Sequence, residues 1–140
     1  AWSTGNAAGF STGVPYRALA GNAGTQHVAA QLADPASLLN HYRALLNLRR
    51  TTPALRDGDY ANAAATGALL TFQRRTAGQL AVVVINFGSA SADAALTALP
   101  ANATLQAALP TGGANATADA AGQARVTVPA QSVRVYTTAR

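Results

Sequence analysis

The run from Val28 to Tyr60 constrains the fold most, because an amphipathic helix there leads through a Pro/Gly turn into short strands. Asp34 and Pro35 form a helix start signal, with Asp34 as N-cap and Pro35 at the first helical position. Apolar side chains then recur every three or four residues, at Leu38, Leu39, Tyr42, Leu45 and Leu46. Pro53 cannot continue a helix. The pattern therefore predicts a helix over residues 34–52 with a wide apolar face.

From Gly58 onward the period changes to that of strands. Residues 67–75 and 79–87 read as two strands joined by a turn, and the block AVVVIN within the second is apolar on both faces, as in a central strand. Further short strands are expected near residues 91–97, 104–109, 125–128 and 132–137, the last two as a pair separated by Pro129. Short strands at this spacing predict a mainly β fold, an antiparallel β-sandwich.

The first 24 residues form an irregular segment. Gly, Asn and Ser punctuate it, and Pro15 interrupts it, so no regular element is expected before a short helical turn over residues 25–32. A loop of this length is typically functional or disordered. Its three aromatic residues, Trp2, Phe10 and Tyr16, favour order, because aromatic side chains gain much from burial.

Composition excludes several classes of function. Every basic residue is Arg and every acidic one is Asp, and the chain has no Cys, which removes disulfides, thiolate metal sites and a Cys nucleophile. The net charge is +5, but the arginines are scattered, which argues against a nucleic-acid partner. The longest apolar run, residues 80–85, is too short to cross a bilayer, so no membrane partner is expected. The chain also contains no Met, and we expect it to be a C-terminal piece of an enzyme.

Four stretches together resemble the C-terminal end of the α-amylase family, glycoside hydrolase family 13: WSTGNAAGFSTGVPYRAL, HVAAQLADPASLLNHYRALLNLRRTTPALRDGDY, LAVVVINF and VPAQSVRVY. The resemblance is closest to the bacterial α-amylase and oligosaccharide α-glucosidase branches. It implies that residues 1–57 are the last loop and helix of a catalytic (β/α)8 barrel. Residues 58–140 would be the Greek-key β-sandwich called domain C. A complete barrel needs about 250 residues, more than this chain has.

The same resemblance implies a parent enzyme, of bacterial periplasmic or secreted type, that cleaves α-glucosidic bonds of starch-type oligosaccharides with retention. Such enzymes use two carboxyl groups about 5 Å apart. In this family these are an Asp nucleophile and a Glu acid/base, beside a second Asp that stabilises the transition state, all on barrel strands upstream. The chain has no Glu, so we assign it no catalytic residue and expect no hydrolysis by the chain alone.

Other constellations have simpler interpretations. Asp57 and Asp59 flank Gly58 and read as a turn rather than a catalytic pair. Two histidines, His27 and His41, are too few for a metal site and are expected at a surface or interface. No cofactor is therefore assigned to the chain, while calcium binding by the parent enzyme stays open.

The best candidates for substrate binding are Trp2, Phe10, Tyr16 and Arg17, in a loop that would border the substrate cleft. The competing interpretation is that these rings only pack the loop against the barrel. The expected partners are the remainder of the barrel and an α-glucan or maltooligosaccharide. Without that barrel, the apolar helix face is expected to pack on the sandwich or to form a homodimer. The alternative function is a free-standing carbohydrate-binding or interaction module.

Overall fold

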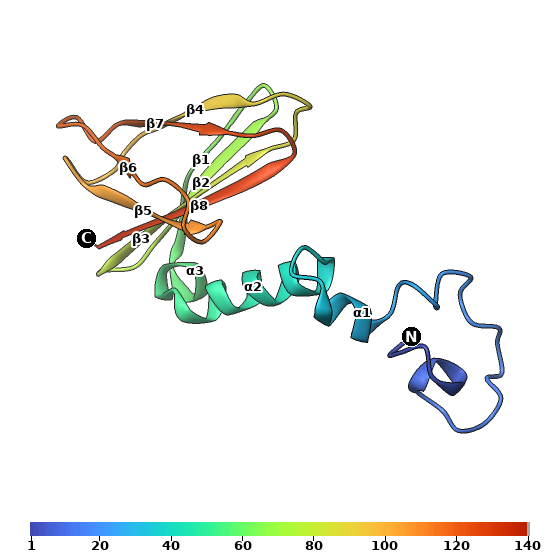
Figure 1. Cartoon of the computed structure of the whole chain (residues 1–140). Helices are drawn as coiled ribbons and strands as arrows, with labels where there is room; N and C mark the ends of the chain where they lie inside the picture. Colours follow the sequence, from blue (N-terminus) through green and yellow to red (C-terminus); the bar gives the residue numbers. More distant parts are fainter. Residues whose placement is uncertain (140) are drawn as a thin grey trace. The chain divides into compact units, whose positions relative to one another are not determined.

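The computed structural model describes residues 1–139, and the chain packs as two compact units, Ala1–Asn47 and Leu48–Arg140. The first unit contains an irregular N-terminal segment with the 3-10 turn η1 (Asn6–Gly9), followed by helix α1 (Val28–Ala33). Helix α2 (Leu38–Thr51) begins in this unit and ends in the second (Figure 1). The second unit continues with helix α3 (Pro53–Asp57) and eight strands.

The strands form the expected antiparallel sandwich of two sheets. One sheet has the order β1-β2-β3-β8-β5-β6 and the other contains β4 and β7, with every pair antiparallel (Figure 1). The bounds are β1 (Asp59–Thr66), β2 (Leu69–Arg75), β3 (Gln79–Asn86), β4 (Ala92–Leu96), β5 (Thr104–Leu109), β6 (Ala116–Thr117), β7 (Ala124–Val128) and β8 (Ser132–Ala139). The mainly β class predicted from the sequence is confirmed.

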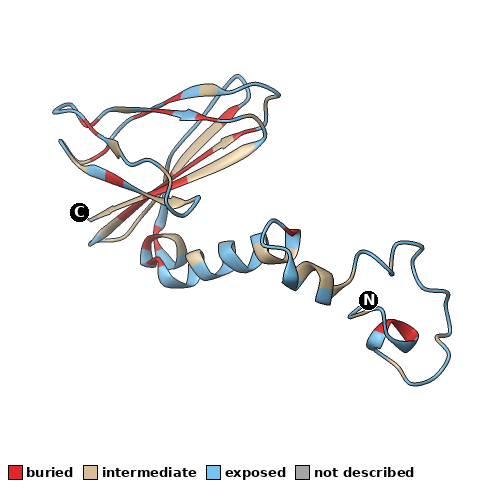
Figure 2. Ribbon diagram, viewed as in Figure 1, coloured by how far each residue is buried: buried red, intermediate tan, exposed pale blue. Residues whose placement is uncertain are grey.

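The core lies between the two sheets. Alternate residues of β3, Leu80, Val82 and Val84, face the apolar residues of β7, Val126 and Val128, and all are buried. Buried stretches of the strands are red in Figure 2. The intervening β3 residues are buried as well, which the two-sided apolar pattern predicted. Helix α3 lies against β2 and β3. The central strand is thus covered on both faces.

Two expectations about the strands were wrong. Strands β7 and β8 do not pair with each other: β7 pairs with β4, and β8 lies between β3 and β5. Proline cannot donate to a sheet ladder, and Pro129 lies where the chain crosses from one sheet to the other. Strand β1 was not predicted, because its sequence DYANAAAT is poor in strand-forming residues. It forms by pairing with β2 at the sheet edge.

The helix boundaries also differ from the prediction. Helix α2 begins at Leu38 rather than Asp34, because Asp34 ends α1 and its carboxylate accepts the Ala36 amide at 2.9 Å. The hydroxyl of Ser37, which is buried, accepts the Asn40 amide at 3.2 Å and so caps α2 instead. Pro53 starts α3 as its first residue, a position where its missing N–H carries no cost.

Candidate functional site

The N-terminal segment folds back on helix α1. The amides of Trp2 and Ser3 both donate to the carbonyl of Ala8, at 2.8 and 3.1 Å. The carbonyls of Ala1 and Trp2 in turn accept the amides of Val28 and Ala29, at 3.1 and 2.9 Å. The first amides of a helix have no partner within it, so these contacts satisfy two of them and fix the loop to the helix.

The turn that closes this segment has an unusual backbone. Ala7 and Ala8 have φ of 48° and 57°, in the left-handed region, and both side chains are buried. Gly9 follows with φ of 76°. The left-handed conformation costs a non-glycine residue about 1–2 kcal/mol. Strain of this kind clusters at ligand-binding and catalytic sites, so the turn marks the segment as a functional candidate.

His27 has a structural role that the sequence reasoning did not identify. Its Nδ1 accepts the amide of Ala30 at 3.1 Å, which makes the imidazole the N-cap of α1. His41 is exposed on α2. Within residues 1–139 no group of three or more His, Cys, Asp or Glu side chains is placed to hold a metal ion.

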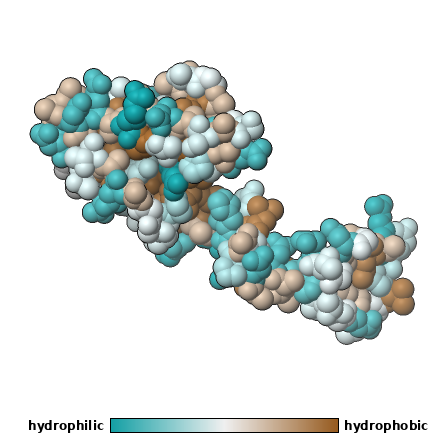
Figure 3. All heavy atoms as spheres, turned by 45° about the horizontal axis from the view of Figure 1, so that its top comes forward, coloured by the Kyte–Doolittle hydropathy of each residue, from teal (hydrophilic) through white to brown (hydrophobic). Residues whose placement is uncertain are grey.

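The four predicted substrate-binding residues all lie on the surface of the first unit. The exposed fractions are 61% for Trp2, 56% for Phe10 and 101% for Tyr16, and Arg17 is exposed as well. In the described part of the chain, no side-chain hydrogen bond, ion pair or ring contact joins these four to one another. Val14, which is 97% exposed, shares this surface but was not predicted because it is not aromatic. Apolar side chains reach the surface of the N-terminal segment (brown in Figure 3).

A second apolar surface runs along helix α2. Leu38, Tyr42 and Leu46 recur every four residues and are more exposed than buried, while Leu39 and Leu45 are half-buried. No helix within the described residues is long and apolar enough to cross a membrane. The helix thus carries the apolar face that its spacing predicted, and what covers this face stays a prediction.

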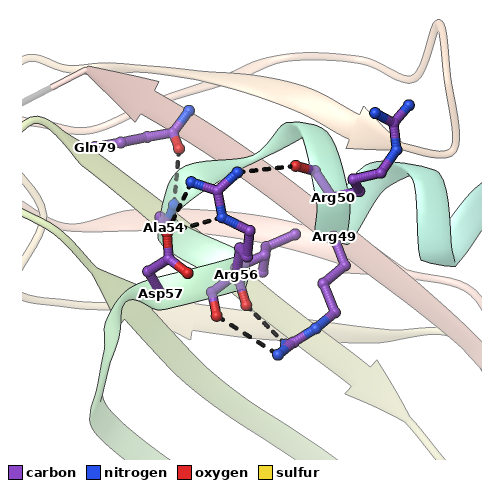
Figure 4. A network of polar contacts seen from close by, with 7 residues as sticks. Arg49, Arg50, Ala54, Arg56, Asp57 and Gln79 are labelled. Atoms are coloured by element: carbon purple, nitrogen blue, oxygen red, sulfur yellow. Dashed lines mark hydrogen bonds and ion pairs between the residues drawn. The ribbon is translucent and has the colours of Figure 1, made fainter.

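The end of α2 is joined to the sandwich by a polar network (Figure 4). The Arg49 guanidinium donates to the carbonyl of Leu55 at 2.8 Å, and the Arg56 guanidinium to that of Arg50 at 3.4 Å. Arg56 also pairs with Asp57 at 2.8 Å. These bonds satisfy carbonyls at the ends of α2 and α3. Asp59 opens β1, so Asp57 and Asp59 flank a helix-to-strand junction, close to the turn that was expected.

Sequence comparison identifies relatives of this chain. The family model for the alpha-amylase catalytic domain matches residues 1–58. A probable alpha-glucosidase of Rhizobium meliloti is 33% identical over 91 residues, covering 65% of this chain and 16% of that protein. A trehalose-6-phosphate hydrolase of Escherichia coli is 34% identical over 86 residues, covering 61% and 16%. The chain thus spans about one sixth of the length of these curated relatives.

Solved structures agree with the sequence matches. The trehalulose synthase of Pseudomonas mesoacidophila superposes with a TM-score of 0.72 at 25% identity, over 99% of this chain and 24% of that one. An Anoxybacillus alpha-amylase superposes with a TM-score of 0.63 at 22% identity, over 73% and 22%, and supports the fold alone.

Proposed function

Because this chain belongs to the α-amylase family, glycoside hydrolase family 13, we propose that it supplies the last loop and helix of the catalytic barrel together with domain C. In this proposal the enzyme cleaves α-glucosidic bonds of starch-type oligosaccharides with retention of configuration. The observation that carries it is the match of residues 1–58 to the catalytic domain, over the segment with the left-handed turn and exposed aromatic rings. The proposal includes a domain boundary between residues 57 and 58.

Within that enzyme the chain has a structural and a positioning role. The apolar face of α2, with Leu38, Tyr42 and Leu46, packs on the rest of the barrel, which removes these side chains from water. Burying one such side chain is worth about 1.5–3 kcal/mol. Domain C then holds the end of α2 through Arg49, Arg56 and α3.

The chemistry itself lies outside this chain. Retaining hydrolysis needs a nucleophile and an acid/base about 5 Å apart. The chain offers five Asp and no Glu, and Asp57 is already paired with Arg56. What the chain contributes is a surface on which the apolar face of a sugar ring stacks, at Trp2, Phe10 and Tyr16, with Arg17 donating to hydroxyl groups.

The second candidate function is a carbohydrate-binding module that acts without a catalytic domain. The exposure of Trp2, Phe10 and Tyr16 favours it, because aromatic rings at the surface are a common platform for sugars. It differs from the first proposal in requiring oligosaccharide binding by the 140-residue chain alone.

The test combines two measurements. Reading the coding frame immediately upstream of Ala1 is expected to give a barrel with an Asp and a Glu at the ends of successive strands. The 140-residue chain incubated with maltose and maltotriose is expected to release no glucose. An upstream frame without a barrel overturns the enzyme proposal, and glucose release by the 140-residue chain overturns the assignment of catalysis to residues outside it.

A further inference from the structure

The sandwich carries a polar cavity that the proposed function does not use. The cavity has a volume of about 270 Å³ and opens between the loop before β6 and strands β7 and β8. Its polar lining comes from Asn115, Arg125, Thr127, Arg134 and Tyr136. All five residues belong to the second unit. They lie far in sequence from the N-terminal loop with Trp2, Phe10 and Tyr16, called the aromatic loop below.

Two of these side chains have no polar partner among residues 1–139. Tyr136 is only 5% exposed, yet its hydroxyl makes no hydrogen bond there. The hydroxyl is not fully buried, since Arg74 Nε is the one fully buried side-chain polar atom of the described residues without a partner, so the Tyr136 hydroxyl is accessible from the cavity that the residue lines. Arg134 is a half-buried residue, and its guanidinium likewise has no acceptor in the described chain. Both residues lie two positions apart on β8, so their side chains project from the same face of the sheet.

Of the remaining lining residues, Arg125 adds positive charge and Asn115 adds a donor. The carboxylate of Asp93 is 3.9 Å from the Arg125 guanidinium, a contact between exposed groups that is worth little. That carboxylate already accepts the Thr127 hydroxyl at 2.6 Å. The side-chain oxygen of Asn115 accepts the Ala107 amide at 2.9 Å, which leaves the Asn115 amino group as a donor.

We propose that this cavity binds a small oxyanion, a phosphate or a carboxylate group, between Arg134 and Arg125. The Tyr136 hydroxyl and the Asn115 amino group complete the set of donors. A neutral sugar fits less well, because its hydroxyl protons need acceptors and no carboxylate lines the cavity. Guanidinium groups match the geometry of phosphate and carboxylate oxygens and form charge-assisted hydrogen bonds with them.

The test is a titration of the protein with sodium phosphate, and separately with sodium acetate, at constant ionic strength. Amide shifts in β7 and β8 are followed by NMR, since general salt effects change many amides without saturating. Saturating amide shifts in β7 and β8 are expected with phosphate, with acetate or with both. The anion that gives them shows whether the cavity takes a phosphate or a carboxylate group. Arg134→Gln is expected to weaken binding roughly tenfold or more, the usual effect of losing a hydrogen bond from a charged group.

Two further variants separate the site from its surroundings. Tyr136→Phe keeps the buried ring and removes only the hydroxyl, so it is expected to weaken binding several-fold while the fold is retained. Arg43→Gln removes the same charge from an exposed position in the first unit and is expected to leave the affinity unchanged. Linear shifts with both anions, equal affinity in Arg134→Gln, or saturation of these amides by maltose instead would each overturn the proposal.

Discussion

The amide of Ala54 donates a hydrogen bond of 3.0 Å to the side-chain oxygen of Gln79, which lies 25 residues further along the chain (Figure 4). Ala54 is completely buried near the start of α3, and Gln79 is the first residue of β3. The bond gives an otherwise unpaired helix amide its acceptor and joins the helical segment to the central strand of the sandwich.

Gln79→Ala is expected to lower the free energy of unfolding by about 1–2 kcal/mol, because it leaves the buried Ala54 amide without an acceptor. Gln79→Glu keeps an oxygen at this position and adds a negative charge near a helix N-terminus, so it is expected to retain most of the stability. Urea unfolding of both variants measures the difference. Equal losses would contradict the assigned bond.

Gly58→Ala is expected to destabilise the junction between α3 and β1 by about 2–3 kcal/mol. A Cβ at this position meets the carbonyl oxygen of Ala54 and backbone atoms of Arg75, none of which can move as a flexible side chain does. Gly78→Ala is the control: a Cβ there meets nothing within 4 Å, and the expected change is within about 0.5 kcal/mol. Thermal unfolding of the two variants compares them directly.

Asn86, the last residue of β3, bonds to the backbone where the chain passes from one sheet to the other. Its replacement is expected to lower the free energy of unfolding of the sandwich more than most substitutions. It is 1% exposed, and its amino group contacts the carbonyls of Ala90, Val128 and Pro129 at 2.8–3.0 Å. Asn86→Asp is expected to cost about 3 kcal/mol or more near pH 7, because a buried carboxylate would face three carbonyl oxygens.

The Asn86→Asp deficit should shrink at acidic pH. Burial raises the pKa of such a carboxyl above its unfolded value, so the penalty is present at high pH and is lost as the folded carboxyl becomes protonated. Ser91→Ala is the control, since Ser91 donates to the same Val128 carbonyl at 3.3 Å from an exposed position. Urea unfolding at several pH values checks both expectations.

The apolar face of α2 is expected to cause self-association of the 140-residue chain. Combined replacement of Leu38, Tyr42 and Leu46 by Gln should convert a concentration-dependent dimer into a monomer, because it removes the exposed apolar stripe. Ala44→Gln, on the opposite side of the helix, should leave the dimer intact. Sedimentation equilibrium measures both. If the unsubstituted 140-residue chain is a monomer at all concentrations, with this face in water, the expectation is contradicted.

The aromatic loop is expected to give millimolar or tighter binding of maltotriose if it contacts sugar without the rest of a cleft. Trp2→Ala should then abolish the binding, since the ring that stacks on the sugar is lost. Leu19→Ala is the matched control, because Leu19 is another exposed apolar residue of the same segment. Isothermal titration calorimetry distinguishes the two. Binding that survives Trp2→Ala would remove the loop from the candidate site.

Much of the sandwich could be predicted from the sequence. The strongest patterns, such as AVVVIN in β3, combine strand-forming residues with burial of all but Ile85, so local preference and tertiary packing agree. Strand β1 escaped prediction because its Ala-rich sequence has no such preference and becomes a strand only by pairing with β2. Likewise Asp34 has the features of an N-cap, yet Ser37 caps α2 because α1 ends at Asp34.

The candidate sites were predictable to different degrees. The aromatic loop could be proposed from residue types alone, and whether it binds substrate stays a prediction. The cavity at Arg125 and Arg134 could not, because these residues lie in strands that do not pair with each other. Nothing in the linear spacing indicates that the two guanidinium groups line one cavity.

By itself the sequence determined most of the strands, the antiparallel class of the sheet and the family resemblance, because these depend on local periodicity and on motifs within short stretches. Only the tertiary structure decided which strands are neighbours and which polar groups share a cavity. Those features depend on contacts between distant residues, such as Asn86 with Val128 and Ala54 with Gln79. A bond across such a separation forms only when the whole sandwich closes, so no local pattern records it.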